Sequence, residues 1–124
     1  MFFSRRAGHR YFHRGDPTDP DFEVGDFTKD GAWHSLDLSG IIPKTAKLVS
    51  LKIMAICGAA GGYMGVRKNG ATDTLNIDTE KSLPIAGVAE FGLCVTPDSD
   101  GVIEYKIPEL PFPTLEMIVG GWFK

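Results

Sequence analysis

The chain is poor in cysteine and histidine, with two and three respectively in 124 residues, and it has no long apolar run. No segment approaches the ~20 consecutive apolar residues of a transmembrane helix, so we expect no membrane-spanning segment and no membrane partner. Two cysteines are too few for the disulfide framework of a small secreted domain. The first arginines follow the apolar pair Phe2–Phe3, which is not the order of a signal peptide. We therefore expect synthesis in the cytoplasm without a secretory signal.

An excess of basic residues is also missing. The formal net charge is −3, which makes nucleic acid an unfavourable partner. The charge is uneven, however, because residues 1–14 hold several arginines and no acidic residue. Such a basic arm can bind an acidic surface or a neighbouring subunit, and the alternative is a solvated terminus.

Glycine and proline are abundant, with 15 and 8 residues, which indicates short segments joined by turns. Apolar and polar residues alternate with a period of two, as they do on half-buried strands, and no window combines a 3.6-residue period with helix caps. The predicted strands cover residues 32–39, 47–57, 63–68, 72–77, 85–95, 103–107 and 114–123.

About seven to eight short strands at near-regular spacing predict an all-β fold, an antiparallel β-sandwich of jelly-roll-like type. Residues 1–27 contain Pro17, Pro20 and many aspartates, so they are expected to form an irregular N-terminal arm. Residues 28–124 are expected to form one β-sandwich domain. A chain of this size can bury enough surface to fold alone.

The Asn69-Gly70 dipeptide follows the strand predicted at 63–68. Asn-Gly is the strongest short signal for a two-residue hairpin, because both central residues of a type I′ turn need positive φ. The sequence therefore predicts a tight hairpin that returns through residues 72–77.

Two predicted strands are apolar on both faces. In 47–57, alternate residues from Val49 to Cys57 form the core face, and the opposite face ends in apolar residues around Met54. In 114–123, Ile118 and Trp122 are predicted on the face opposite Leu115. One small monomer does not need two apolar faces, so Met54, Ile118 and Trp122 are candidates for an oligomer interface.

No set of residues has the spacing of a catalytic or metal centre. Ser35, His34 and Asp37 are close in sequence, but neighbours on a strand point to opposite faces and no nucleophile elbow is present. Asp98 and Asp100 resemble a fragment of a calcium loop, and a hairpin turn is the alternative interpretation. We therefore expect no enzyme activity, no catalytic residue, no cofactor and no resident metal.

Cys57 and Cys94 each lie in a predicted strand. A buried free thiol is the usual state of such a residue, and a disulfide between neighbouring strands is the alternative. The aromatic residues Trp33 and Tyr63 are candidates for a ligand platform, although aromatic residues in small sandwiches more often belong to the core or an interface.

A longer pattern then emerges along the chain. Residues 30–43 read DGAWHSLDLSGIIP, an apolar strand follows at 46–53, Arg-Lys-Asn-Gly stands at 67–70, and Gly-Gly-Trp-Phe closes an apolar strand at 120–123. This pattern resembles small β-sandwich proteins of bacteriophage and prophage virions, of the tail- or head-fibre type. The resemblance covers residues 28–124. It implies a jelly-roll-like domain on the surface of a phage particle, often trimeric, with an N-terminal arm that attaches to the particle.

Two hypotheses for function follow. The first is a structural or attachment protein of a phage-like virion, made in the host cytoplasm, that forms homo-oligomers with a trimer favoured. In it, residues 1–27 contact other virion proteins. The second is a carbohydrate-binding sandwich module, calcium-assisted through the Asp98 turn, for which a cell-surface glycan would be the partner.

Overall fold

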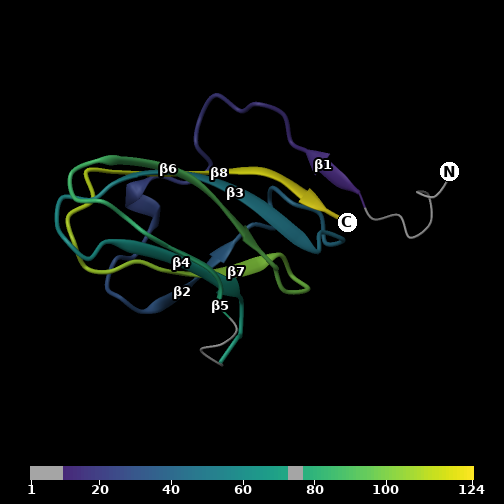
Figure 1. The fold of residues 1–124 in the computed structure, drawn as a ribbon. Helices are drawn as coiled ribbons and strands as arrows, with labels where there is room; N and C mark the ends of the chain where they lie inside the picture. The colour runs from purple at the N-terminus through teal and green to yellow at the C-terminus, as the bar shows by residue number, and fades with distance from the viewer. Residues whose placement is uncertain (1–9, 73–76) are drawn as a thin grey trace, which may run out of the picture.

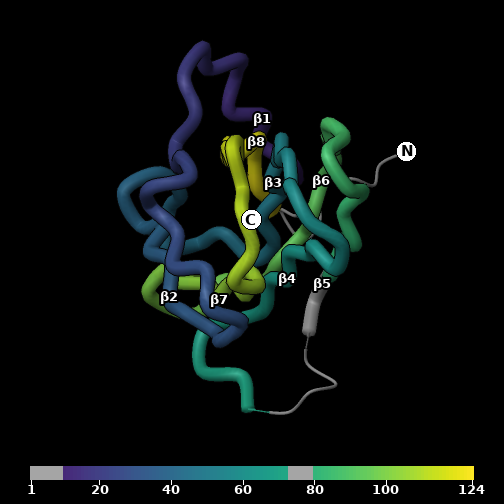
Figure 2. Tube along the Cα trace, turned by 90° about the vertical axis from the view of Figure 1, so that its left-hand side faces the viewer, coloured from purple at the N-terminus to yellow at the C-terminus, as the bar shows by residue number. Residues whose placement is uncertain are grey.

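Two antiparallel four-stranded sheets face each other (Figures 1 and 2) in the computed structural model, which describes residues 10–72 and 77–124. The all-β sandwich predicted from the alternation is confirmed. The elements are β1 (Tyr11–His13), the 3₁₀ helix η1 (Val24–Asp26), β2 (Trp33–Asp37), β3 (Leu48–Ile56), β4 (Tyr63–Lys68), β5 (Ile77–Ser82), β6 (Val88–Val95), β7 (Val102–Lys106) and β8 (Thr114–Phe123).

The strand order is that of a jelly roll. Sheet A has the order β1-β8-β3-β6 and sheet B has the order β2-β7-β4-β5. The first strand therefore pairs with the last, β2 with β7, β3 with β6, and β4 with β5, as in one long hairpin rolled into two layers. The rolled hairpin brings residues far apart in sequence together on each outer face.

The core lies between the sheets and is built from the inward-facing residues of both. Along β3, Val49, Leu51, Ile53 and Ala55 are buried, as the alternation predicts. Sheet B contributes inward residues from three strands, namely Leu36, Met64, Val66, Ile103 and Tyr105. Because every second residue points into this core, the intervening residues form the two outer faces.

The segment expected as an irregular arm is attached to sheet A from Arg10 onward. Tyr11–His13 forms β1, which pairs with Phe123, Trp122 and Gly121 of β8. Phe22 then forms an isolated bridge with Met117, and the ring of Phe27 is buried. The sequence did not indicate β1, because three residues are too few to show a period.

Between β1 and Phe22 the chain leaves the sheet, and an ion pair closes the base of the loop. Arg14 pairs with Asp21, with a 2.8 Å hydrogen bond from Arg14 Nη2 to Asp21 Oδ1. The Asp21 carboxylate accepts the Val119 N–H at 2.8 Å, and Arg14 donates to the Val119 carbonyl at 3.2 Å. Two side chains thus satisfy the backbone N–H and C=O of Val119 on the side of β8 away from β3, between β1 and the Phe22 bridge.

The tight Asn69-Gly70 hairpin is not formed. Arg67 pairs with Ile77, so the connection from β4 to β5 is longer than two residues. Gly70 has a φ of +85° in a turn closed by Ala71 N–H to Lys68 O, but Asn69 does not have positive φ. A type I′ turn needs both. The returning strand predicted at 72–77 falls largely on 73–76, outside the described residues, and β5 begins at Ile77.

A β-bulge in β8 reverses the faces of its last residues. Leu51 pairs with Val119 and Ser50 with Gly121, so Gly120 is the extra residue. Trp122 then pairs with buried Val49 and packs against the core. The prediction that Trp122 shares a face with Ile118 was wrong, because one extra residue exchanges the two faces of the strand beyond it.

Gly121 leaves room for β1, and this generates the first prediction. A Cβ atom there would lie 2.4 Å from the Phe12 carbonyl oxygen and 2.3 Å from the Tyr11 hydroxyl. We expect Gly121→Val to lower the free energy of unfolding by about 1–3 kcal/mol, the usual cost of overpacking. Urea denaturation measures it.

Gly92→Ala is the matched control. A Cβ atom at Gly92 would meet only the Leu51 carbonyl oxygen, at an ordinary 3.5 Å. Equal stability of Gly121→Val and Gly92→Ala would show that β1 does not pack on β8 as described.

Candidate functional site

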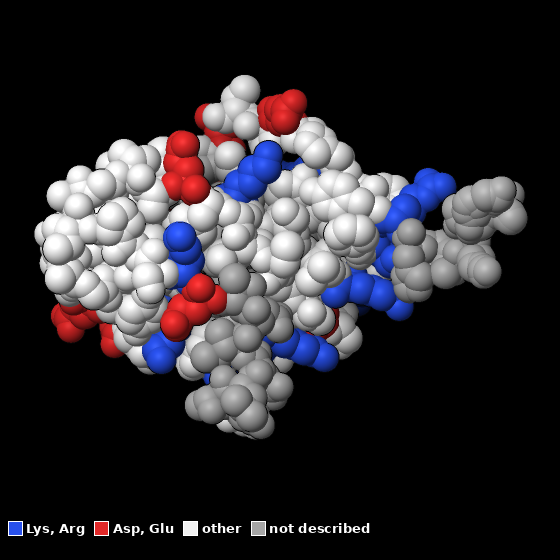
Figure 3. Space-filling view, viewed as in Figure 1, with Lys and Arg blue, Asp and Glu red and all other residues white. Residues whose placement is uncertain are grey.

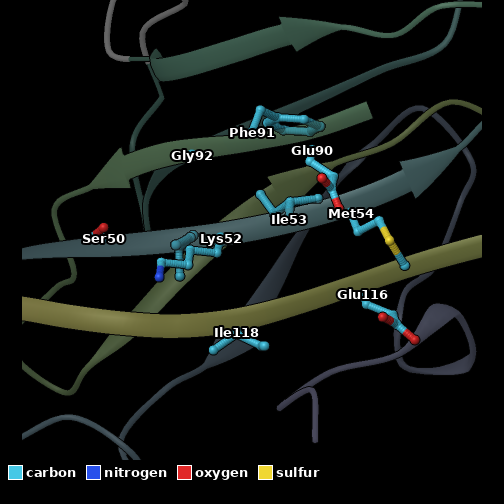
Figure 4. Close-up of a pocket in the computed structure, with 10 residues that line it drawn as sticks. Ser50, Lys52, Ile53, Met54, Glu90, Phe91, Gly92, Glu116 and Ile118 are labelled. Atoms are coloured by element: carbon cyan, nitrogen blue, oxygen red, sulfur yellow. The ribbon is translucent and has the colours of Figure 1, made fainter. Parts of the chain in front are cut away.

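The outer face of β6, β3 and β8 carries a shallow hollow of about 490 Å³ (Figure 4). Its lining includes Met54 and Ile118, two of the three residues predicted for an interface. Their side chains are half-buried, in the way expected of apolar groups on an uncovered sheet. Trp122 is not part of this surface, because the bulge turns it inward.

The strand register arranges this face in rows. Glu90, Met54 and Glu116 form one row across β6, β3 and β8, and Gly92, Lys52 and Ile118 form the next. One amine and two carboxylates therefore surround the apolar pair. Gly92 adds no side chain, and this keeps the hollow open beside Lys52.

Apolar residues extend the face towards both ends. Ile56 pairs with Val88, whose side chain is 61% exposed. At the other end the ring of Phe123 lies 5.0 Å from the ring of Tyr11, and both are about two-fifths exposed. Exposed large apolar residues at both ends of one sheet indicate an interaction surface.

Trp33 and Tyr63 lie on the outer face of sheet B, but their rings do not form an open platform. The Arg67 guanidinium lies 4.1 Å from the Trp33 ring centroid, and its Nε donates to Glu104 at 2.6 Å. Lys106 Nζ stands between the two rings, 5.7 Å from that of Trp33 and 6.0 Å from that of Tyr63. The Arg67 guanidinium therefore already covers a face of the Trp33 ring.

The Asp98 carboxylate is used within its own turn. One oxygen accepts the N–H groups of Asp100 and Val102, each at 2.9 Å, and the other accepts Asn69 Nδ2 at 2.9 Å. The Asn69 hydrogen bond, followed by that from Val102, lowers the pKa of Asp98 below its usual 3.8. Of the two interpretations, the hydrogen bonds favour a turn over a calcium loop, because the carboxylate oxygens already accept hydrogen bonds. The turn is not a hairpin, because it joins β6 of sheet A to β7 of sheet B, and these strands do not pair.

The residues of the rejected triad also have structural partners. His34 Nε2 lies 2.8 Å from Asp30 Oδ1, and this hydrogen bond lowers the pKa of Asp30. Asp37 accepts the Ser39 N–H at 2.8 Å, and Ser35 is exposed. Among residues 10–72 and 77–124, no three His, Cys, Asp or Glu side chains gather where they could hold a metal ion.

Cys57 and Cys94 are not joined by a disulfide. Cys57 is buried and its Sγ lies 3.3 Å from the Ala59 carbonyl oxygen, whereas Cys94 lies exposed on the outer face of β6. The prediction of a buried thiol holds for Cys57 and was wrong for Cys94, which alternates outward between buried Leu93 and Val95.

Sequence reasoning missed Lys52, Glu90 and Glu116 as parts of the site, because surface charges on a strand carry no signal by themselves. Sequence reasoning also missed the Lys106 ammonium near the rings of Trp33 and Tyr63. Strand pairing alone brings these residues together. The signal available from the sequence was the apolar residues on both faces of the strands at 47–57 and 114–123, which located Met54 and Ile118.

The sequence matches no protein-family model and no curated protein. The described part of the chain contains no helix long and apolar enough to cross a membrane.

The Asp98 turn yields a prediction about pH. A carboxyl whose pKa is lowered by folding stabilises the fold above its unfolded value of 3.8, and this contribution disappears as pH falls through the folded value. Asp98→Asn keeps an acceptor but cannot ionise. We expect the variant to be less stable than the wild type at pH 7, with the difference shrinking below pH 3.8. Urea unfolding at several pH values measures this, and a constant difference would contradict it.

Proposed function

We propose that this chain is a non-enzymatic structural or attachment domain that acts through its sheet faces as a homo-oligomer. The observation that carries the proposal is the outer face of sheet A, where Met54 and Ile118 line an open hollow. Apolar side chains on an uncovered sheet gain free energy when another surface removes them from water. A second copy of the chain is a partner that is always available.

The proposal includes a position on the surface of a phage-like particle, which the resemblance to phage virion proteins implies together with a trimer. The basic end of the sandwich supports attachment there. Lys and Arg side chains gather where β8 ends (Figure 3), and the backbone joins Lys124 to Arg10 and Lys47 to Phe123. A basic end beside Arg10 and β1 fits an acidic surface on another virion protein.

A prediction about oligomer formation concerns Ile118. Placing a carboxylate in the apolar hollow should oppose burial of that face, because an unpaired charge is costly to desolvate. We expect the wild type to have a mass that is a multiple of the monomer, and Ile118→Glu to shift it to the monomer. Size-exclusion chromatography with light scattering measures this.

Ser35→Glu is the control, because Ser35 is exposed on the outer face of sheet B. It should keep the mass of the wild type. A wild type that stays monomeric at high concentration would remove self-association from the proposal.

Carbohydrate binding is the second candidate, favoured by one observation. Trp33 and Tyr63 lie on one outer face with the Lys106 ammonium between them. Aromatic rings beside a hydrogen-bond donor suit a sugar, provided that the cation over Trp33 moves aside. This module would work without calcium at Asp98, whose oxygens are already engaged.

A glycan array with and without calcium tests this candidate. We expect binding that Trp33→Ala reduces at least tenfold and that calcium does not change. Phe123→Ala, on the other sheet, is the control and should bind as the wild type does. Unchanged binding by Trp33→Ala, at an unchanged unfolding midpoint, would exclude the platform, as would an array with no signal.

A further inference from the structure

We infer that the outer face of sheet A binds the same face of a second copy across a two-fold axis, with Lys52 of each copy opposite Glu116 of the other. This inference rests on the proposed self-association and specifies its partner and register. It concerns the face of β1, β8, β3 and β6 described above.

Charge complementarity is the first argument. The ion pairs of the described residues join Arg14 with Asp21, His34 with Asp30, and Arg67 with Glu104. None of them uses the amine or the carboxylates that surround the hollow. Lys52 and Glu116 lie one strand and one row apart (Figure 4), so the face carries both signs at separate places. A surface with both signs can complement a copy of itself.

The register decides which axis satisfies these charges. On an ideal sheet the rows are ~7 Å apart and the strands ~5 Å apart. Consider a two-fold axis that lies in the plane of the face, passes through the midpoint between Lys52 and Glu116, and is perpendicular to the line joining them. This axis places Lys52 of one copy opposite Glu116 of the other. Met54 and Ile118 lie almost on that axis, so each meets its own counterpart. The strands of the two copies then cross steeply, as in orthogonal sheet packing.

Other axes fit less well. An axis along β3 would place Lys52 against Lys52, and an axis along the rows would place Lys52 against Met54. The diagonal axis leaves one repulsive contact, Glu90 against its counterpart. Glu90 is exposed on the edge strand β6, where its carboxylate can turn into solvent.

The size of the face limits the strength of the contact. The three long strands β6, β3 and β8, with nine residues in β3, give a plan of about 30 Å by 14 Å, or roughly 420 Å². Its accessible area is larger, because side chains such as Val88, Tyr11 and Phe123 stand out from the plane. Because the strands of the two copies cross steeply, only the central part of each face is covered. This is less than the roughly 800 Å² per partner of a standard interface, so the dimer is expected to be weak. A two-fold contact also predicts an even-numbered assembly in place of the trimer.

A charge exchange tests the pairing. Lys52→Glu alone and Glu116→Lys alone each create two like-charge contacts per dimer, and each should weaken dimerisation at least tenfold. An equimolar mixture of the two variants restores both pairs in a heterodimer, and the double variant restores them in a homodimer. Glu90→Gln removes the repulsive contact and should tighten the dimer. Analytical ultracentrifugation and native mass spectrometry measure these assemblies.

Glu80→Lys, an exposed charge reversal on sheet B, is the matched control and should dimerise as the wild type does. A wild type that dimerises while single variants do so equally well would overturn the inference and leave the proposed function standing. So would variants that stay apart when mixed, or an odd-numbered wild-type assembly. A monomeric wild type would overturn both.

Discussion

The pairing of β3 with β8 is the constraint on which the rest of the structure depends. It joins a strand from the middle of the chain to the last one, and each of these also holds an outer neighbour, β6 or β1. Val49, Leu51, Leu115 and Met117 are buried on its inner side. The nested pairing of a jelly roll can close only if these two strands meet in the middle of sheet A. Their outer side carries the hollow lined by Met54 and Ile118.

The period of two in the sequence predicts which residues of these strands are buried, but only up to the point where the period is broken. It correctly located β2, β3 and β6 and the buried residues of β3, because half-buried strands must alternate. It failed beyond Gly120, where one extra residue moved Trp122 from the outer face to the core. The adjacent glycines at 120 and 121 were the available signal, since glycine within a strand often marks a bulge or a close approach. The Asn69-Gly70 pair led to a wrong prediction of a tight hairpin for a different reason. The preference of this dipeptide for a type I′ turn is local, whereas the register of β4 with β5 requires a longer connection.

The outer faces of the two sheets differ in how far their charges are already satisfied. On sheet B, Arg67 stacks on Trp33 and is held by Glu104, so aromatic, cation and anion form a closed set. On sheet A, strand pairing separates Lys52 from Glu90 and Glu116 by apolar side chains. Composition could not distinguish these situations, because both faces contain the same kinds of residue. Register and side-chain geometry pair Arg67 with Glu104 within sheet B, whereas the ion pairs of the described residues do not use Lys52, Glu90 or Glu116.

Charges on an apolar face also determine how that face can be covered. A purely apolar sheet face would accept a partner in many registers, which is the hazard of uncovered sheets. With Lys52 and Glu116 present, any register that buries either of them without an opposite charge pays a desolvation penalty, often of several kcal/mol per ion. In the proposed dimer, the apolar residues around Met54 and Ile118 would supply the free energy of association. The charges would reject the wrong registers, so they would contribute more to specificity than to affinity. Under this proposal, the amine and two carboxylates at the rim of the hollow have a role separate from that of its apolar residues.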